Sequence, residues 1–204
     1  MHFLVTAGGT REYIDPVRFI SNASSGRMGY ALALAALGAG HRVTLITAPT
    51  AQQPPSEAKI VKVETAEEMF GAVRKHFSRC DCLIMAAAVA DYTIVRPAKT
   101  KIKSAKNGLT IKLKPTADIL EWAGKHKKKN QKVVGFALEE RNVRARAEKK
   151  LKEKNLDMII ANTPAAIGAD KTSVQIKMPS RKWLRLPQAS KTKIAKKIIG
   201  LLVC

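Results

Sequence analysis

The sequence predicts an α/β fold of the Rossmann-like, doubly wound type, with a mostly parallel sheet and helices on both faces. Short apolar or β-branched segments alternate with segments of helical composition along most of the 204 residues, which is the pattern of βαβ units. The first apolar segment is followed by a long polar loop and then by a helix of small residues. Open α/β sheets bind ligands at this position, beyond the carboxyl end of the first strand.

The first strand and helix enclose this polar loop. Residues 2–7 form an apolar run that ends at Gly8-Gly9-Thr10, as expected of a buried strand and a tight turn. Residues 27–37, RMGYALALAAL, are strong helix formers. The connection between them is far longer than the ~2–6 residues that usually join a strand to a helix. We therefore expect the loop to form a functional site.

Further elements follow from local composition. Thr65 and Glu68 have the spacing of a capping box and predict a helix that ends near Phe77. A Lys/Arg/Glu-rich segment predicts another helix at 143–154. A proline-rich loop at 48–56 ends the second strand. Apolar or alternating segments predict the remaining strands at residues 42–47, 59–63, 82–88, 132–137 and 156–161.

Two regions interrupt this alternation within a single predicted domain, residues 1–204. Residues 92–115 are basic and contain prolines, and the alternating segment 109–113 predicts one strand of an inserted β-hairpin flap over the carboxyl edge of the sheet. Residues 174–177 and 183–186 predict a C-terminal hairpin. Ser190 is then expected to cap a last helix, whose apolar residues share one face: Ile194, Ala195, Ile198 and Leu202.

The charge balance limits the classes of partner. The chain has 37 Lys+Arg and 16 Asp+Glu, a net charge of +21, which favours anionic partners such as nucleotides, phosphorylated metabolites, nucleic acid or acidic membrane surfaces. For most of these lysines a solvated helix face is the simpler interpretation. Aromatic residues are 5% of the chain, too few for the stacking platform of single-strand binders. We therefore expect no nucleic acid partner.

Cysteine and apolar content indicate a cytoplasmic protein. Three cysteines, Cys80, Cys82 and Cys204, show no disulfide spacing, which fits a reducing compartment. Cys82 begins an apolar strand and no second cysteine pair or nearby histidine completes a metal site, so burial is expected instead. No signal peptide is indicated. The longest apolar run, residues 30–39, is far shorter than the ~20 residues that span a bilayer, so no membrane association is expected.

The residues also suggest two other functional classes. A dinucleotide-binding dehydrogenase is suggested by the G-x-x-G spacing of Gly26 and Gly29, but this motif alone is weak. The strand at 42–47 lacks a following acidic residue for a ribose hydroxyl, and no Tyr/Lys pair of the short-chain dehydrogenase type is present. A P-loop is excluded because no glycine is followed by Lys and then Ser or Thr. A non-enzymatic polyanion-binding protein is the second alternative, motivated by the net charge.

Several separated motifs carry a specific resemblance to one family. In order, they are AGGTREYIDPVRFISNASSGRMG, AAAVADY (86–92), KIK (101–103), Asp118-Ile119, VGFALE (134–139), KEKNLDMIIAN (152–162) and SKTKIA (190–195). Together they resemble the bacterial, CTP-dependent phosphopantothenate–cysteine ligases of coenzyme A biosynthesis, over nearly the whole chain. Bacterial relatives are often fused behind a flavin-dependent decarboxylase, so we expect either a stand-alone ligase with a separate decarboxylase partner or an excised half.

The resemblance implies a two-step reaction. The carboxylate of phosphopantothenate attacks the α-phosphate of CTP, which releases pyrophosphate and gives an acyl-cytidylate. The amine of cysteine then displaces CMP. Mg²⁺ accompanies the nucleotide, but its ligands are not identified from the sequence. Eukaryotic relatives use ATP instead. The family also implies a homodimer in which the flap of one subunit helps to close the site of the other.

The resemblance also assigns residues. The amide of Asn22 would hold the carboxylate and the acyl intermediate, with Arg18 and Lys101 as the other catalytic residues. Arg18 could equally bind Asp15. Phosphate contacts are expected from Gly8, Gly9, Ser24, Ser25 and Gly26, although turn geometry explains the glycines equally well. CTP contacts are expected from Met85, Ala86, Ala87, Asp91, Lys101, Ala117, Asp118, Ile119, Leu120, Phe136, Lys150 and Lys154.

Simpler interpretations remain for some of these residues. Asn22 could be an ordinary turn residue, Asp91 could cap a turn, and Phe136 could belong to the core. Lys150 and Lys154, four residues apart, share a helix face that could simply be solvated. The flap also departs from the family pattern: Ser104 stands where relatives commonly carry a lysine, and Lys106 is a candidate to replace the lost charge.

Overall fold

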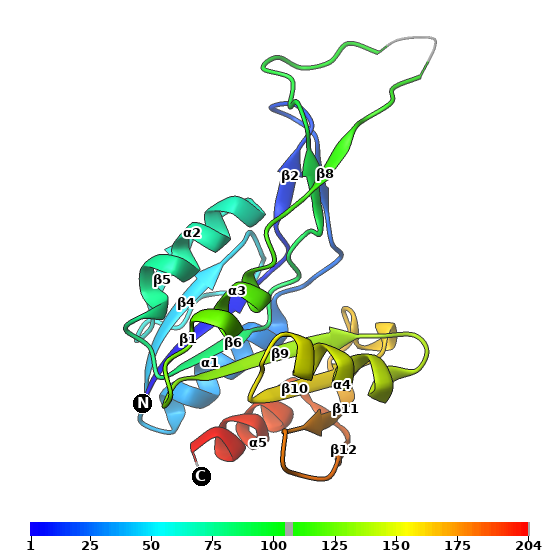
Figure 1. Ribbon diagram of the computed structural model, residues 1–204. Helices are drawn as coiled ribbons and strands as arrows, with labels where there is room; N and C mark the ends of the chain where they lie inside the picture. The colour runs from blue at the N-terminus through cyan, green and yellow to red at the C-terminus, as the bar shows by residue number, and fades with distance from the viewer. Residues whose placement is uncertain (105–107, 204) are drawn as a thin grey trace.

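The structure is a computed structural model that describes residues 1–104 and 108–203. Its centre is an eight-stranded sheet with the order β12-β11-β10-β9-β6-β1-β4-β5 (Figure 1). The strands are β1 (His2–Ala7), β4 (Arg42–Thr47), β5 (Lys59–Lys62), β6 (Cys82–Met85), β9 (Lys132–Leu138), β10 (Met158–Asn162), β11 (Lys171–Lys177) and β12 (Leu184–Ser190).

Six neighbouring strands of this sheet, β5, β4, β1, β6, β9 and β10, run parallel. Strands β11 and β12 add an antiparallel edge beside β10. In chain order the parallel strands are arranged 3-2-1-4-5-6, the order of the Rossmann fold. The predicted fold class is therefore confirmed. The strand order reverses between β1 and β6, and a crevice is expected at the carboxyl ends of these two strands.

Helices cover both faces of the sheet (Figure 1). They are α1 (Arg27–Gly38), α2 (Ala66–Phe77), α3 (Ile119–His126), α4 (Val143–Glu153) and α5 (Lys191–Val203), with a 3₁₀ turn, η1 (Pro164–Ala166). Alternate residues of β1 separate the two cores. Phe3 and Val5 pack with α1 and α5, whereas Leu4 packs with α2, α3 and α4. The capping box of α2 is present as predicted, with both Thr65 and Glu68 engaged.

Two small hairpins project from the carboxyl edge of the sheet. The first pairs β2 (Arg11–Tyr13) with β3 (Phe19–Ser21), inside the loop that precedes α1, and the second pairs β7 (Tyr92–Ile94) with β8 (Leu113–Pro115). We call the described residues of 11–21 and 92–115 the arm. The predicted inserted hairpin is therefore present at the carboxyl edge of the sheet, but the arm extends away from the sheet instead of covering that edge (Figure 1). Lys106 lies outside the described residues.

Several element boundaries differ from the predictions. The strand predicted at 82–88 ends at Met85 because the chain turns into the loop that borders the crevice. The strand predicted at 109–113 is shifted toward the C-terminus: β8 covers residues 113–115, which pair with β7, and shares only Leu113 with the predicted range. Helix α3 was not predicted. Its signal was Asp118, whose side chain caps the helix by accepting a hydrogen bond from the N–H of Glu121.

The C-terminal region contains the predicted hairpin and helix, and its strands are longer than predicted. The predicted hairpin is formed by the longer strands β11 and β12, which continue the main sheet instead of standing apart. Ser190 accepts a hydrogen bond from the N–H of Lys193, as a cap does. The four apolar residues predicted to share one face of the last helix are all buried.

The cysteine prediction holds where it is tested. Cys80 and Cys82 are buried, as predicted, and burial raises the pKa of the Cys80 thiol to about 11. Cys204 lies outside the described residues. Within residues 1–104 and 108–203, no cluster of three or more His, Cys, Asp or Glu side chains could hold a metal ion. No helix in these ranges has the length and apolar character to cross a membrane.

One glycine sets how closely α1 approaches the sheet. A Cβ on Gly29 would lie 2.5 Å from the Cβ of Ala7 and 2.9 Å from the carbonyl oxygen of Thr6. Contacts this short require the backbone of α1 or β1 to move. Gly29 therefore allows the first turn of α1 to lie directly on the end of β1, beside the crevice.

We predict that Gly29→Ala lowers the free energy of unfolding by ~1–3 kcal/mol, because it overpacks a rigid backbone contact. Gly38→Ala is the matched control, since a Cβ there would meet nothing within 4 Å. Urea unfolding of both variants tests this prediction. Equal stability of the two would show that α1 can shift without cost.

Candidate functional site

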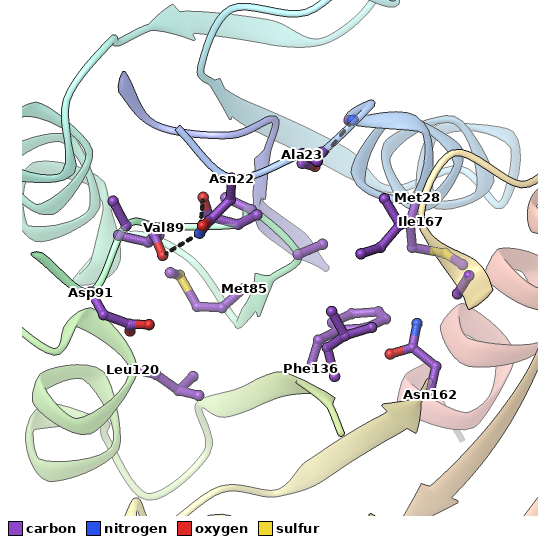
Figure 2. Close-up of a pocket in the computed structure, with 18 of the residues that line it drawn as sticks. Asn22, Ala23, Met28, Met85, Val89, Asp91, Leu120, Phe136, Asn162 and Ile167 are labelled. Atoms are coloured by element: carbon purple, nitrogen blue, oxygen red, sulfur yellow. Dashed lines mark hydrogen bonds between the residues drawn. The ribbon is translucent and has the colours of Figure 1, made fainter. Parts of the chain in front are cut away.

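The site is a pocket of about 630 Å³ at the carboxyl ends of the parallel strands, next to the reversal of strand order (Figure 2). Its lining comes from three parts of the chain that are distant in sequence. These are the start of α1 with the preceding loop, the segment after β6 with α3 and α4, and the connection from β10 to α5. The predicted site residues that line it are Asn22, Ser24, Ser25, Gly26, Met85, Ala86, Ala87, Asp91, Ala117, Asp118, Ile119, Leu120, Phe136, Lys150 and Lys154.

The first wall is the amino-terminal end of α1. Gly26 precedes the helix with a φ of 71°, no side chain caps the helix, and its first turn holds no acidic residue. The turn is fixed from behind, because Thr50 Oγ1 donates to the carbonyl oxygen of Ser25 at 2.9 Å. Backbone N–H groups at such a helix start and the helix dipole favour an anion. This wall can therefore receive a phosphate group.

Asn22 links this wall to the loop after β6. Its Nδ2 donates to the carbonyl oxygen of Val89 at 3.1 Å and, more weakly, to that of Ala88 at 3.4 Å (Figure 2). Both carbonyls belong to the pocket lining, so these bonds hold the amide at the pocket. Asn22 is exposed, and these two bonds orient its amide, which a turn residue facing only solvent would lack.

Gly8 and Gly9 lie behind the pocket and are not part of its lining. Gly8 has a φ of 83°, and a Cβ there would lie 2.7 Å from the carbonyl oxygen of Ala48. A Cβ on Gly9 would lie 2.7 Å from the carbonyl oxygen of Asn22. Their placement corresponds to the turn-geometry interpretation: both glycines allow close backbone packing that positions the Asn22 loop.

The second wall carries paired charges. Asp118 uses one oxygen to cap α3 and the other to form an ion pair with Lys154. Burial opposes ionisation of Asp118, but the hydrogen bonds from Lys154 and from the N–H of Glu121 outweigh it, so the pKa of Asp118 lies below its usual value. Asp91 and Leu120 lie at the same side of the pocket (Figure 2).

Lys150 is a second half-buried cation of this wall. Its Nζ donates to the carbonyl oxygen of Phe136 at 2.9 Å. Burial, followed by the charge of Lys154, lowers the pKa of Lys150. A bound anion would relieve both effects. The two lysines are therefore placed at a pocket rather than on a solvated helix face.

The third wall was not predicted. Arg27 donates to the carbonyl oxygen of Gly168 at 3.2 Å and forms an ion pair with Asp170, which ties α1 to the connection between β10 and β11. Lys191, at the start of α5, also lines the pocket. Burial and the nearby charge of Arg27 lower its pKa. Both residues lie in segments that carry the family resemblance, but nothing local predicts that they meet, because they come together only when β11 and β12 fold back along the sheet.

Arg18 and Lys101, two of the three predicted catalytic residues, are not brought to this pocket. Both belong to the arm. Arg18 forms a 2.8 Å ion pair with Asp15, the alternative that the sequence left open, and its guanidinium also contacts the carbonyl oxygen of Ile102. Among the described residues of this single chain, the pocket therefore contains Asn22 but neither of the other two.

The family of the chain follows from comparison with known proteins. Residues 1–203 match the family described as "DNA/pantothenate metabolism flavoprotein C-terminal domain". The chain belongs to this family. The match covers all three walls of the pocket and the described part of the arm.

The chain is similar to proteins named CoaBC, both in sequence and in structure. The chain is 41% identical over 201 residues to the coenzyme A biosynthesis bifunctional protein CoaBC of Borreliella burgdorferi, covering 98% of this chain and 51% of that protein. The chain thus spans about half the length of this curated relative. A crystal structure of the C-terminal domain of a CoaBC protein is 38% identical with a TM-score of 0.85, covering 98% of this chain and 93% of that one.

A structure with lower sequence identity shares the fold of this chain. A Cab2 mutant in complex with phosphopantothenate-cysteine has a TM-score of 0.83 at 19% identity, covering 99% of this chain and 85% of that chain. At this level of identity the likeness concerns the arrangement of sheet and helices.

Asp118 offers a test of the charged wall. We predict that Asp118→Asn, which keeps an oxygen to cap α3, lowers the free energy of unfolding at pH 7 by less than about 1 kcal/mol, as expected of a partly exposed ion pair. Asp118→Ala also loses the cap, at a further cost of about 1 kcal/mol.

The pH dependence has a defined sign. Because the folded-state pKa of Asp118 is lowered, its ionic contribution is present above its unfolded-state pKa of ~3.9 and is lost as the pH falls through the folded-state value. The difference between wild type and Asp118→Asn should therefore shrink below about pH 4. Urea unfolding from pH 7 to pH 3 measures it, and a difference that stays constant would contradict the prediction.

Proposed function

We propose that this protein is a phosphopantothenate–cysteine ligase of coenzyme A biosynthesis that uses CTP through an acyl-cytidylate. The observation that supports this most is the combination of an anion-binding helix start, an amide side chain and lysines around one pocket, in a family whose named members are CoaBC proteins. Among the described residues, the lining includes no Cys and no His, and such a ligation requires alignment and charge stabilisation rather than a protein nucleophile.

In the first proposed step, the carboxylate of phosphopantothenate attacks the α-phosphate of CTP. The bond from that phosphorus to the bridging oxygen breaks, and pyrophosphate leaves. The N–H groups at the start of α1 and the hydroxyls of Ser24 and Ser25 would bind phosphate oxygens. Lys150 and Lys154 on one side, and Arg27 and Lys191 on the other, would neutralise the charge on the triphosphate.

In the second proposed step, the amine of cysteine attacks the acyl carbonyl, loses a proton and displaces CMP. Asn22 would donate a hydrogen bond to the carbonyl oxygen as it gains negative charge. Its Nδ2 carries two protons, and the 3.4 Å contact with the carbonyl oxygen of Ala88 is weak enough to be exchanged for a substrate oxygen. The stronger bond to Val89 would keep the amide oriented.

The cytidine would lie against the second wall. The segment Met85–Ala87, the residues 117–120 and Phe136 offer backbone groups and apolar surface there. A Mg²⁺ ion that arrives with the nucleotide takes many of its ligands from phosphate and water, so it does not require the three-residue cluster that residues 1–104 and 108–203 lack. Asp91, one of the carboxylates that line the pocket, would contact such an ion, which would supply charge neutralisation.

A homodimer would complete the site. Lys101 lies on the arm, outside the pocket of its own chain, and the arm exposes apolar side chains that a second copy could cover. These are Val17, Phe19, Ile20, Tyr92, Val95 and Leu113. We propose that the arm of one subunit packs on the other and brings its Lys101 to the second pocket.

The central experiment measures pyrophosphate release from CTP with phosphopantothenate and cysteine. Asn22→Ala should lower the rate ~10²–10³-fold, as removal of an oxyanion donor does. Asn130→Ala, an exposed turn residue away from the pocket, is the matched control and should keep full activity. Wild-type protein that leaves CTP intact in the presence of both co-substrates would refute the ligase.

The third wall has a separate test. We predict that Lys191→Met raises the KM for CTP about tenfold or more, because a charge-assisted contact to phosphate is lost. Lys196→Met, on the exposed side of the same helix, removes the same charge away from the pocket and should leave the KM unchanged. Equal values for the two variants would remove Lys191 from the triphosphate site.

A further inference from the structure

We infer that Asp15 and Arg18 are positioning residues that hold the Lys101–Lys103 segment of the arm in the conformation that ligation requires. This inference rests on the proposed function, and it gives Arg18 a role other than contact with substrate. Neither residue lines the pocket of its own chain. Both instead bind the backbone of one residue of the arm, Ile102.

Asp15 is a buried carboxylate in the turn between β2 and β3, with a side-chain exposure of 0%. Its Oδ1 accepts hydrogen bonds from the N–H groups of Val17 and Arg18, each at 2.8 Å. Its Oδ2 accepts from the N–H of Ile102 at 3.1 Å and from Arg18 Nη1 at 2.8 Å. Burying a carboxylate is costly unless it is fully paired, and here each oxygen has two donors.

Arg18 completes the contact from the other side of the same residue. Its Nη1 and Nη2 donate to the carbonyl oxygen of Ile102 at 3.1 and 3.2 Å. Ile102 is therefore bound at both of its backbone groups, the N–H by Asp15 and the C=O by Arg18. A further bond joins the two hairpins nearby, from the N–H of Ala98 to the carbonyl oxygen of Ile14 at 2.8 Å.

The placement of this contact indicates its purpose. Ile102 stands between Lys101 and Lys103, whose side chains are exposed. Because Asp15 and Arg18 bind only the backbone of this segment, at Ile102, they fix its direction and leave the ammonium groups of Lys101 and Lys103 available to a ligand. Without it, little would orient this stretch, since no helix or strand is formed from residue 95 to residue 104. Ordering the lysines in advance reduces the entropy lost when they contact the phosphate oxygens in the transition state, so the effect should fall on kcat.

The geometry also argues against direct substrate contact by Arg18. Its Nη atoms already bind Asp15 and Ile102. A substrate role would require breaking an ion pair with a fully buried carboxylate, which would keep its three backbone N–H donors but lose its only cationic partner among the described residues. The two residues should therefore act as a unit.

The test is a double-mutant cycle with Asp15→Asn, Arg18→Gln and the double variant. Asp15→Asn keeps an oxygen for the turn N–H groups, and thermal unfolding confirms that each variant is folded. Glu121→Gln is the matched control, because it neutralises a carboxylate in an exposed ion pair with Lys125, away from the arm. Hydrogen exchange of the Ile102 amide by NMR measures the contact itself, and pyrophosphate release together with CTP binding measures its consequence.

We expect each single variant to speed exchange of the Ile102 amide and to lower kcat about tenfold or more, as loss of a charge-assisted hydrogen bond does. The kcat of the double variant should be no lower than that of either single variant. In each variant the Kd for CTP should change less than about threefold, although kcat falls about tenfold. Unchanged Ile102 exchange would overturn the inference. An Arg18→Gln loss much larger than that of Asp15→Asn, with additive effects, would also overturn it in favour of a substrate contact.

Failure of the proposed function would look different. Wild-type protein that releases no pyrophosphate from CTP refutes the ligase, whatever the variants do. The Ile102 exchange rates then still decide whether Asp15 and Arg18 hold this segment, because that measurement needs no substrate.

Discussion

The close contact between α1 and the end of β1 is the constraint on which the rest of the site depends. Gly29 lies against Ala7 and Thr6 at a distance that no side chain could occupy. This contact brings the first turn of α1 to the carboxyl edge of the sheet, next to the reversal of strand order between β1 and β6. The positive end of the helix and the open edge of the sheet thus face one space, which gives an anion site without any specialised side chain.

The pocket combines cations from two distant parts of the chain around that helix end. Lys150 and Lys191 both have lowered pKa values because burial disfavours their charged forms. Each would gain from a bound polyanion, so the triphosphate of the proposed reaction would offset an unfavourable concentration of positive charge in the free pocket. The carboxylate of Asp118 and the backbone oxygen of Phe136 keep the α4 lysines oriented until then. This division between orienting and binding groups is what a reaction limited by alignment requires.

The arm follows a different principle from the core. The sheet is stabilised by two apolar layers, whereas the contact at Ile102 is a small polar one built on a buried carboxylate. Polar contacts of this kind demand exact geometry, because an unpaired partner is costly. They suit a segment that must be placed accurately without a core of its own. The exposed apolar side chains of the arm agree with the proposal that a second subunit covers it.

The sequence by itself determined the alternating strands and helices, the doubly wound sheet and the long loop before α1, because each depends on local composition and periodicity. Through the family resemblance it also pointed to Asn22, Asp118 and Lys150 as site residues, and the structure brings all three to one pocket. Only the tertiary structure decided which distant residues meet. It added Arg27 and Lys191 to the pocket, placed Arg18 on Ile102, and left Lys101 outside the pocket of its own chain. These outcomes depend on how the arm projects and how β11 and β12 return along the sheet, and such long-range geometry leaves no periodic signal in the chain.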